Sequence, residues 1–406
     1  MPSIEATEFQ QATEDGAWRV LDGRAQAWFE APSHAAGAAL VQWVAATGPM
    51  PEIDLRSSGL RVRLRGCGDS EVQQAAAISR AARELGLGGD PSALQAMGLV
   101  VEAADPAVLM PFWRTVLGYR ADGARLVDPW QRDPAITFRH DSEARPLRNR
   151  LHVDVVRPPE AVAAAVADLG QTPTGPYGAL LSGRDGNEVD LVAGGPMSDG
   201  ETSDWVAAFA AMAAYPTSTP VQAAQFVAAT SEIADEAGFP LLIDARTEGV
   251  VVDSGKDMWE GPDGPLEDFV SLAAEIQDLA LRLGLMADPI RPRFVQLCLD
   301  VADVATERAF WASLLGYEED PRDGVADILD PRRLNPVVIF QRIDVADEAR
   351  MRQRDRMRIV LSVPFDRVEQ RIDTATAVGG SAIRIGPGFA RLSDPEGNEL
   401  DLVYTS

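Results

Sequence analysis

The segment Phe112-Trp-Arg-Thr-Val-Leu-Gly-Tyr119 recurs, little changed, as Phe310-Trp-Ala-Ser-Leu-Leu-Gly-Tyr317. A second pair follows at matching places, Asp185-Gly-Asn-Glu-Val-Asp-Leu-Val192 and Glu396-Gly-Asn-Glu-Leu-Asp-Leu-Val403. Two pairs of similar segments in the same order indicate an internal duplication, which decides the architecture of the whole chain. The sequence therefore predicts two halves, roughly 1–195 and 200–406, joined by a linker of small, polar and turn-forming residues at 194–203.

Around the repeated segments, hydrophobic periodicity predicts one strand, one helix and further strands, twice in each half. In the first half the predicted strands are 98–104, 119–127, 134–140, 150–156, 178–182 and 187–192, with helices at 106–117 and 159–169. In the second half the predicted strands are 294–300, several up to 341, 356–363, 389–393 and 398–404, with helices at 303–315 and 365–377. Each half thus contains two βαβββ units.

The region before these units differs in pattern. In the first half, the runs 18–20 and 25–30 flank Asp22-Gly23 and predict a hairpin, followed by a helix at 33–47, a strand at 59–65 and a helix at 69–86, in the order αββαβα. In the second half, helices at 203–214 and 219–237, a strand at 248–253 and a helix at 265–284 are predicted, without a hairpin counterpart. The expected class is α+β, with domains at 1–90, 93–195, 200–287 and 290–406.

Composition limits the kinds of partner. The 406 residues are 46% hydrophobic and 24% charged, which is typical of soluble globular proteins. No apolar run reaches the ~20 residues of a membrane span, and the N-terminus is acidic, so we expect a cytoplasmic protein without membrane contact. A net charge of −25 disfavours nucleic acid. Cys67 and Cys298 are too few for a disulfide framework and are interpreted as small buried hydrophobic residues.

The βαβββ units, together with the stretches Asn149-Arg-Leu-His-Val-Asp154 and Asp394-Pro-Glu-Gly-Asn-Glu399, resemble the vicinal oxygen chelate superfamily in its glyoxalase-like and bleomycin-resistance-like branch. This resemblance covers about half of the chain. It implies that pairs of βαβββ units close into cupped sheets that hold a ligand. It also implies, in metal-dependent members, a His/His/Glu or Gln/His/Glu set that leaves room for a chelating substrate.

The family positions can be transferred residue by residue. The first half offers Gly98, His152 and Glu188, and the second half offers Gln296, Arg358 and Glu399. Grouped in this way, neither set is intact, because glycine has no donor atom and arginine is a permanent cation that repels metals. We therefore expect no catalytic metal and no other cofactor, and a His152 that is hydrogen-bonded within a sheet.

Residues 1–90, and more faintly 200–287, resemble pterin-4a-carbinolamine dehydratase. That family uses a His-His-Pro after its long helix, and a later histidine, as acid and base groups. Here the corresponding places read Pro49-Met50-Pro51 and Gly238-Phe239-Pro240. The later histidine falls near Gly66-Cys67 and Ser254-Gly255. Without a group that titrates near neutral pH, we expect no dehydratase activity.

Three functional interpretations follow from the resemblance. The leading one is non-metal binding of a small molecule, for sequestration or sensing, with His152, Glu188, Gln296, Arg358 and Glu399 as ligand-binding residues. The alternatives are a lyase or isomerase that uses His152 and Glu188, a residual 4a-hydroxytetrahydropterin dehydratase, and a scaffold without small-molecule chemistry. We expect either a monomer with internal pseudo-two-fold pairing or a homodimer.

One geometric prediction concerns the arginine. If Arg358 and Glu399 point into the same cup, a guanidinium can replace the metal as the tie between strands. The prediction is a charge-assisted pair at about 2.7–3.0 Å, with Gln296 hydrogen-bonded to one of the two partners.

Overall fold

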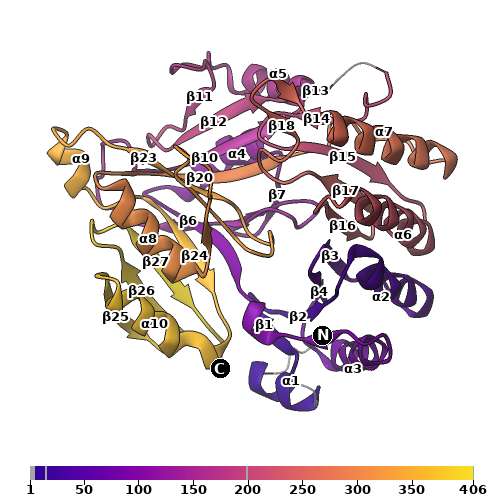
Figure 1. Cartoon of the computed structure of the whole chain (residues 1–406). Helices are drawn as coiled ribbons and strands as arrows, with labels where there is room; N and C mark the ends of the chain where they lie inside the picture. The colour runs from indigo at the N-terminus through magenta and orange to yellow at the C-terminus, as the bar shows by residue number, and fades with distance from the viewer. Residues whose placement is uncertain (1–4, 14–15, 198–199, 406) are drawn as a thin grey trace. The chain divides into compact units, whose positions relative to one another are not determined.

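The computed structural model describes residues 5–13, 16–197 and 200–405 (Figure 1). The described residues form two compact units, and each unit takes one stretch from either half of the chain. Unit 1 lies within Met1–Leu94 and Gly194–Arg293, and unit 2 comprises Gln95–Ala193 and Phe294–Tyr404. Both units mix helices with sheets, so the α+β class is confirmed. The division into four domains stays a prediction.

Unit 1 contains one large sheet. Its first stretch forms α1 (Ala6–Ala12), β1 (Trp18–Leu21), β2 (Arg24–Glu30), α2 (His34–Thr47), β3 (Glu52–Arg56), β4 (Gly59–Arg63), α3 (Asp69–Glu84), β5 (Gly88–Gly89) and a 3-10 turn, η1 (Pro91–Ala93). Its second stretch forms β13 (Gly195–Pro196), β14 (Val206–Ala207), β15 (Ala211–Pro216), α6 (Pro220–Ala237), β16 (Leu242–Arg246), β17 (Gly249–Asp253), β18 (Glu260–Gly261), β19 (Gly264–Pro265) and α7 (Glu267–Arg282).

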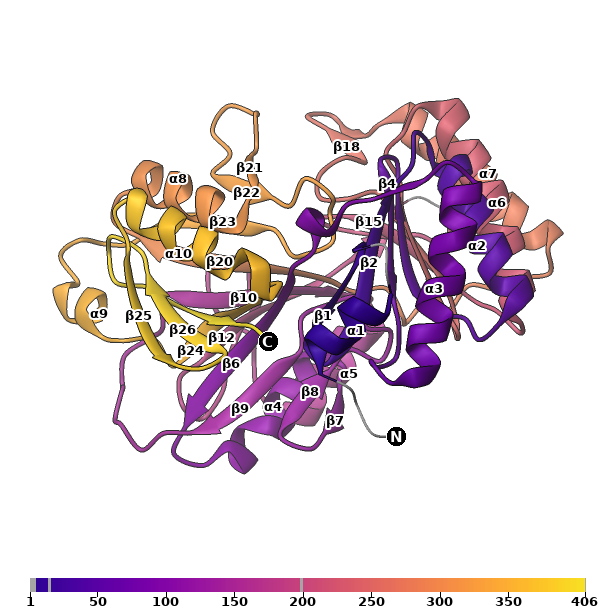
Figure 2. The same ribbon diagram turned by 90° about the horizontal axis from the view of Figure 1, so that it is seen from below.

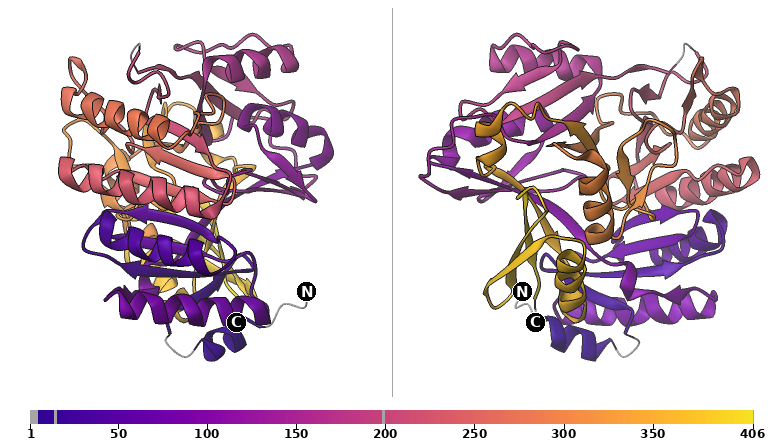
Figure 3. Two further views of the ribbon diagram at one scale, coloured as in Figure 1. Left: turned by 90° about the vertical axis from the view of Figure 1, so that its right-hand side faces the viewer. Right: turned by 60° about the vertical axis from the view of Figure 1, so that its left-hand side comes forward.

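The strands of the large sheet run in the order β1-β2-β4-β3-β16-β17-β15-β14-β13, with β5 added beside β2. The two stretches meet where β3 pairs antiparallel with β16. Helices α3, α2, α6 and α7 pack side by side in that order in one layer (Figures 2 and 3). Their apolar sides and the sheet form the core of this unit.

The helix predicted at 203–214 is wrong. This stretch instead forms β14 and β15, a hairpin whose second strand pairs with β17, just as β2 pairs with β4. The hairpin that seemed to lack a counterpart therefore has one. The segment is rich in alanine, the strongest helix former. Ala211, Ala213 and Tyr215 are nevertheless fully buried in the core, and this tertiary packing outweighs local propensity.

Unit 2 contains two sheets and the helices that cover them. Its first stretch forms β6 (Ala96–Ala103), α4 (Pro106–Leu117), β7 (Arg120–Asp122), β8 (Arg125–Val127), β9 (Ile136–His140), β10 (Leu151–Arg157), α5 (Pro159–Leu169), β11 (Leu180–Ser182) and β12 (Glu188–Ala193). Its second stretch forms β20 (Phe294–Val301), α8 (Val304–Leu315), β21 (Glu318–Glu319), β22 (Asp327–Leu329), β23 (Val338–Arg342), α9 (Glu348–Arg352), β24 (Met357–Ser362), η2 (Phe365–Arg367), α10 (Val368–Ala377), β25 (Ser381–Gly386), β26 (Phe389–Ser393) and β27 (Glu399–Val403).

The repeated segments that begin at Phe112 and Phe310 contribute the second half of helices α4 and α8. Local residues determine where these two helices begin and end. Asp105 and Asp303 cap the N-termini, because each side chain accepts a hydrogen bond from a backbone N–H of the first turn. Gly118 and Gly316 end the helices with φ of 66° in both cases, a left-handed conformation that glycine adopts without steric cost. Trp113 and Trp311 are buried in the core, as expected for their place in the helices.

Strand pairing in unit 2 crosses between the halves of the chain. One sheet has the order β11-β12-β10-β20-β23-β22-β21 and the other β25-β26-β27-β24-β6-β9-β8-β7. We call them the His152 sheet and the Arg358 sheet, after the residues on β10 and β24. In each sheet, one predicted βαβββ unit comes from the first half and one from the second. Figure 2 shows β6 beside β24 and β9.

This pairing corrects the grouping of the candidate site residues. Gln296 on β20 joins His152 and Glu188 on the His152 sheet, whereas Gly98 on β6 joins Arg358 and Glu399 on the Arg358 sheet. The two sets expected within single halves are therefore wrong.

No helix of the described residues is long and apolar enough to cross a membrane.

Candidate functional site

Alternation along three strands gives the His152 sheet one apolar and one polar face. Leu151, Val153 and Val155 of β10 lie in the core, as do Val295, Leu297 and Leu299 of β20 and Val189 and Leu191 of β12. Neighbouring side chains in a strand point to opposite faces. His152 and Asp154 therefore share the other face with Gln296 and Cys298, which lie opposite Asp154 and His152, respectively, in the antiparallel β10–β20 pair.

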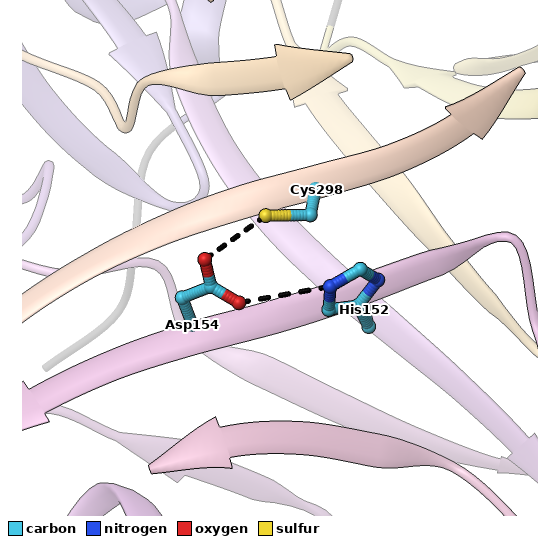
Figure 4. Close-up of side chains that lie close together, drawn as sticks. All are labelled: His152, Asp154 and Cys298. Atoms are coloured by element: carbon cyan, nitrogen blue, oxygen red, sulfur yellow. Dashed lines mark hydrogen bonds and ion pairs between the residues drawn. The ribbon is translucent and has the colours of Figure 1, made fainter. Parts of the chain in front are cut away.

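These four side chains form a contiguous cluster, which we call the polar quartet: His152, Asp154, Gln296 and Cys298. Asp154 is central, because its Oδ2 accepts hydrogen bonds from Gln296 Nε2 at 2.9 Å and from Cys298 Sγ at 3.1 Å. Its Oδ1 lies 3.7 Å from His152 Nε2 (Figure 4). All four residues are buried, with at most 7% of their surface exposed.

The quartet has hydrogen-bonding atoms left over. His152 Nδ1, Asp154 Oδ1 and Gln296 Oε1 are buried and form no hydrogen bond. Each such atom costs ~1–3 kcal/mol of lost hydration if it stays unsatisfied. Burial raises the pKa of the Cys298 thiol well above its ordinary value, and the Asp154 carboxylate adds to the rise. The thiol is therefore protonated and acts as a hydrogen-bond donor.

Two further carboxylates flank the quartet on β12, which runs parallel to β10. Glu188 is half-buried and ion-paired with Arg148, a residue whose side chain is 42% exposed. Asp190 is half-buried, and burial raises its pKa, with the Asp154 carboxylate adding to the rise. The face is thus richer in acceptors and negative charge than in donors.

Three members of the quartet have donor atoms suited to a divalent metal. The ligand atoms of His152, Asp154 and Cys298 all lie within 4.8 Å of one another. Metal ligands at about 2.0–2.3 Å in a tetrahedral site stand about 3.3–3.8 Å apart, so small side-chain shifts would bring the three donors onto one ion. Imidazole, carboxylate and thiolate together suit zinc and similar borderline metals. The unsatisfied Oδ1 of Asp154, which lies 3.7 Å from His152 Nε2, supports this fit.

The equivalent face of the Arg358 sheet has different chemistry. Arg358 is 1% exposed and donates a hydrogen bond of 2.5 Å to Glu102 on β6. Arg145 and Arg354 bind the other oxygen of Glu102, each at 2.8 Å. Burial by itself raises the pKa of Glu102, but these arginines outweigh it and lower the pKa to about 2. The face is occupied by a network of ion pairs.

The predicted tie between Arg358 and Glu399 is only a secondary contact. Arg358 Nε lies 3.7 Å from Glu399 Oε2, which is an ion pair but not the hydrogen bond that we expected. The main partner is Glu102 on β6, a residue that none of the sequence patterns singled out. Gln296 contacts neither residue, because it lies on the other sheet and binds Asp154.

The other histidines do not form a site. His140 is exposed, whereas His34 is only 1% exposed. Its ring nitrogens lie 3.0 Å from Asp235 Oδ1 and 2.8 Å from the carbonyl oxygen of Leu241. His34 is therefore bound into the packing of α2 against α6. The absence of dehydratase activity stays a prediction.

Sequence reasoning missed two members of the quartet, Asp154 and Cys298. Both residues are two positions from a candidate that was named, Asp154 from His152 and Cys298 from Gln296. Strand periodicity of two places such pairs on one face, so this signal was available. It was of little use without the knowledge that β10 pairs with β20.

Comparison with known proteins places the structure in context. A family model described as "Glyoxalase-like domain" matches residues 98–192 and 296–403, which together make up half of the chain. None of the curated proteins matches the chain significantly.

Three of the solved structures to which the chain is similar are as follows. A glyoxalase I mutant from Zea mays is 12% identical and covers 76% of this chain and 94% of its own, with a TM-score of 0.37. A putative dioxygenase from Bacillus subtilis is 11% identical, and the match covers 76% of this chain and 84% of the dioxygenase chain, with a TM-score of 0.38. A glyoxalase/bleomycin resistance protein/dioxygenase family enzyme from Burkholderia phytofirmans is 16% identical, covers 27% and 95%, and has a TM-score of 0.21.

Proposed function

Because the chain belongs to the family of glyoxalase-like domains, we propose that it binds a small molecule on the polar face of the His152 sheet. The observation that carries this proposal is the set of buried, unsatisfied atoms of His152, Asp154 and Gln296. A ligand that offers hydrogen-bond donors or positive charge to these atoms would replace the hydration that they lose on burial. Glu188 flanks the same position, and its partner Arg148 is exposed enough to be displaced.

The Arg358 sheet is not proposed as a second ligand site. Arg358 stands where the repeated sequence has His152, and Glu102 and Asp401 already balance its charge. A ligand would have to compete with buried ion pairs, and breaking one leaves an uncompensated charge that costs ~3–5 kcal/mol. Of the two sheets, only the His152 sheet is therefore proposed as a ligand site, and ligand binding by Arg358 and Glu399 stays a sequence-based prediction.

A thermal-shift screen of small metabolites tests the proposal. A ligand present at 100 times its Kd adds ~2.7 kcal/mol to the stability of the native state. We expect ligands found with the wild-type chain to lose this effect in Gln296→Ala and His152→Ala, and to keep it in His140→Ala, an exposed control. Ligands whose effect survives both quartet substitutions would contradict the assignment to this face.

A second candidate function is a metal-dependent lyase or isomerase at the same face. It is favoured by the donor atoms of His152, Asp154 and Cys298, which would hold the ion, with Gln296 and Glu188 beside them. When bound, a divalent metal would polarise a substrate oxygen. Glu188, which is not one of these three donors, is the flanking carboxylate available to accept a proton from a substrate.

Titration with Co²⁺ tests the metal part of this candidate. We expect about one ion per chain and an absorption band from a cobalt–thiolate bond, since metal binding deprotonates a coordinating thiol. The band should disappear in Cys298→Ser, and affinity should fall at least tenfold in His152→Ala but not in His140→Ala. Absence of binding at millimolar Co²⁺ would leave the metal-free binding site as the function.

A further inference from the structure

Arg356, the residue immediately before β24, has a buried charge without a partner. Only 5% of the surface of Arg356 is exposed. Its Nε, Nη1 and Nη2 atoms are all buried, and none of them forms a hydrogen bond. Among the arginines of the described residues, no other has all three guanidinium nitrogens in this state.

Such an arrangement is costly. The guanidinium stays charged at every physiological pH and carries five N–H donors. Other buried arginines of the chain have acidic partners: Arg246 binds Asp54 at 2.6 Å, and Arg358 binds Glu102. An unpaired buried charge is destabilising by several kcal/mol, so Arg356 is missing an acceptor that the folded chain does not supply.

The acidic groups near Arg356 are already engaged. Asp185 accepts hydrogen bonds from the backbone and side chain of Asn187. Asp355 accepts a hydrogen bond of 2.8 Å from the backbone N–H of Arg150. Burial lowers the pKa of Arg356, and the carboxylates of Asp185, Asp355 and Glu188 oppose that shift through space without forming an ion pair.

The repeated sequence provides an internal comparison. Arg150 precedes Leu151-His152 as Arg356 precedes Met357-Arg358. Arg150 is also buried, but its Nη1 donates to the carbonyl oxygen of Glu396 at 3.3 Å and lies 3.9 Å from Glu396 Oε2. Glu396 belongs to the turn before β27. The matching turn before β12 has the shorter Asp185, and Arg356 makes no such bond there.

The position of Arg356 relates it to the proposed ligand face. Its Nη2 is close to Gly186, where an added Cβ would come within 3.4 Å of that nitrogen. Gly186 lies in the turn that leads into β12, two residues before Glu188, which flanks the quartet. A side chain at 186 would touch the guanidinium, whereas glycine places no side chain against Nη2.

We propose that Arg356 binds the anionic group, a carboxylate, phosphate or sulfate, of the molecule that occupies the polar face of the His152 sheet. Arginine is suited to this role, because its planar fork matches two oxygens of such groups. The inference rests on the proposed function and adds the class of ligand: an acid or acid ester whose polar end meets the quartet and whose anionic end meets Arg356.

Anion titration of the full-length chain tests the proposal directly. Melting temperature and isothermal titration calorimetry are measured with sodium acetate, sulfate and phosphate, each against sodium chloride at equal ionic strength. We expect at least one oxyanion to raise the melting temperature of the wild type in a saturable way. Its Kd should rise at least tenfold in Arg356→Met and less in Arg356→Lys, which keeps the charge.

Arg150→Met serves as the matched control, because it removes a buried arginine that has its own partner; it should lower stability but leave the oxyanion Kd unchanged. The proposal is wrong if no oxyanion acts differently from chloride, or if Arg356→Met binds the oxyanion as the wild type does. Should Arg356→Met fail to fold, an unchanged Kd in Arg356→Lys and in Gly186→Ala, which crowds the guanidinium, overturns it equally.

The result is independent of the ligand screen. Oxyanion binding is measured again in His152→Ala, in which the quartet is broken and Arg356 is intact. Binding that persists there supports the role of Arg356 even if no metabolite is found for the quartet. Loss of binding in His152→Ala together with retention in Arg356→Met would place the anion at the quartet and contradict the proposal.

Discussion

The His152 sheet and the Arg358 sheet have the same strand pattern and opposite chemistry on their polar faces. Buried atoms without a hydrogen bond occur on both faces: those of an imidazole, a carboxylate and an amide on the His152 sheet, and Arg358 Nε, Arg358 Nη1 and Glu399 Oε2 on the Arg358 sheet. On the Arg358 sheet, the guanidinium at the matching position brings positive charge into the face, and Glu102 and Asp401 surround it. An internal arginine thus supplies what an external cation or donor would supply. A single residue type at one strand position can separate a binding face from an ion-pair network.

The strongest test of this contrast is Arg358→Met. Removing the guanidinium leaves Glu102 and Asp401 buried with less compensation, and breaking a buried pair in this way costs ~3–5 kcal/mol of unfolding free energy. His152→Met should change that free energy by only about 1 kcal/mol, because Nδ1 of the imidazole forms no hydrogen bond and Nε2 has only a 3.7 Å contact with Asp154. Urea unfolding followed by circular dichroism measures both.

Arg139→Met is the control, since Arg139 pairs with Asp401 at 3.4 Å but its side chain is 45% exposed. Its effect should stay within about 0.5 kcal/mol. Equal losses for Arg358→Met and His152→Met would show that the two faces contribute alike to stability.

Acid stability tests the same network by another route. The pKa of Glu102 is about 2 in the folded chain against an ordinary value of 4.5, so its stabilising effect is complete above pH 4.5 and is lost as the pH falls toward 2. A difference of this size corresponds to about 3 kcal/mol. Urea unfolding at several pH values should show a steep loss in this window that is absent in Glu102→Gln. A parallel pH profile for both proteins would disprove the assignment.

Glu307 on α8 should also make stability depend on pH, but in the opposite direction to Glu102 and with a smaller change in unfolding free energy. Burial raises its pKa to about 9, and Asp394 and Glu396 add to the rise. The stability that this proton confers is complete below pH 4.5, the ordinary value, and is lost as the pH rises toward 9. Glu307→Gln, which mimics the protonated acid, should therefore be more stable than the wild type by roughly 1–2 kcal/mol at pH 8. No gain at pH 8 would show that the carboxylate is ionised in the native chain.

The last prediction is that the thiol of Cys298 in the quartet does not react with reagents from solution while the chain is folded. Cys298 is fully buried and its pKa is raised, and Cys67 is also buried, so neither thiol should react with Ellman's reagent at pH 8 in the native chain. Both should react after denaturation in urea. Rapid reaction of the native protein, lost in Cys298→Ser, would show that the polar face is open and its thiol accessible.

Local patterns predicted most elements of unit 2, but they did not predict which strands pair. Alternation of apolar residues along β10 and β20 identifies strands and their faces, and the capping residues Asp105 and Asp303 mark where the helices begin. Pairing depends on contacts between residues that are far apart in sequence. Hydrophobic periodicity is a local pattern and does not report these contacts. The alanine-rich β15 shows the reverse limit, since its burial in a sheet overrides a strong local preference for helix.

The same limit applied to the candidate site. His152 and Gln296 were both selected from the sequence, yet they were placed in different sets because each half was expected to close its own cup. Once β10 pairs with β20, Asp154 and Gln296 become neighbours and the quartet follows from alternation alone. Arg356 could not have been selected, because an unpaired charge is recognised only when the positions of all possible partners are known.

The crossed pairing also sets the timing of folding during synthesis. Strand β6 ends at Ala103, and its partner β24 begins at Met357. At ~5–20 residues per second, a ribosome needs roughly 10–50 s to make the intervening stretch of about 250 residues. During that time the edge of β6 is exposed and able to pair with a strand of another nascent chain. Chaperones, or a low local concentration of nascent chains, would reduce this pairing between chains.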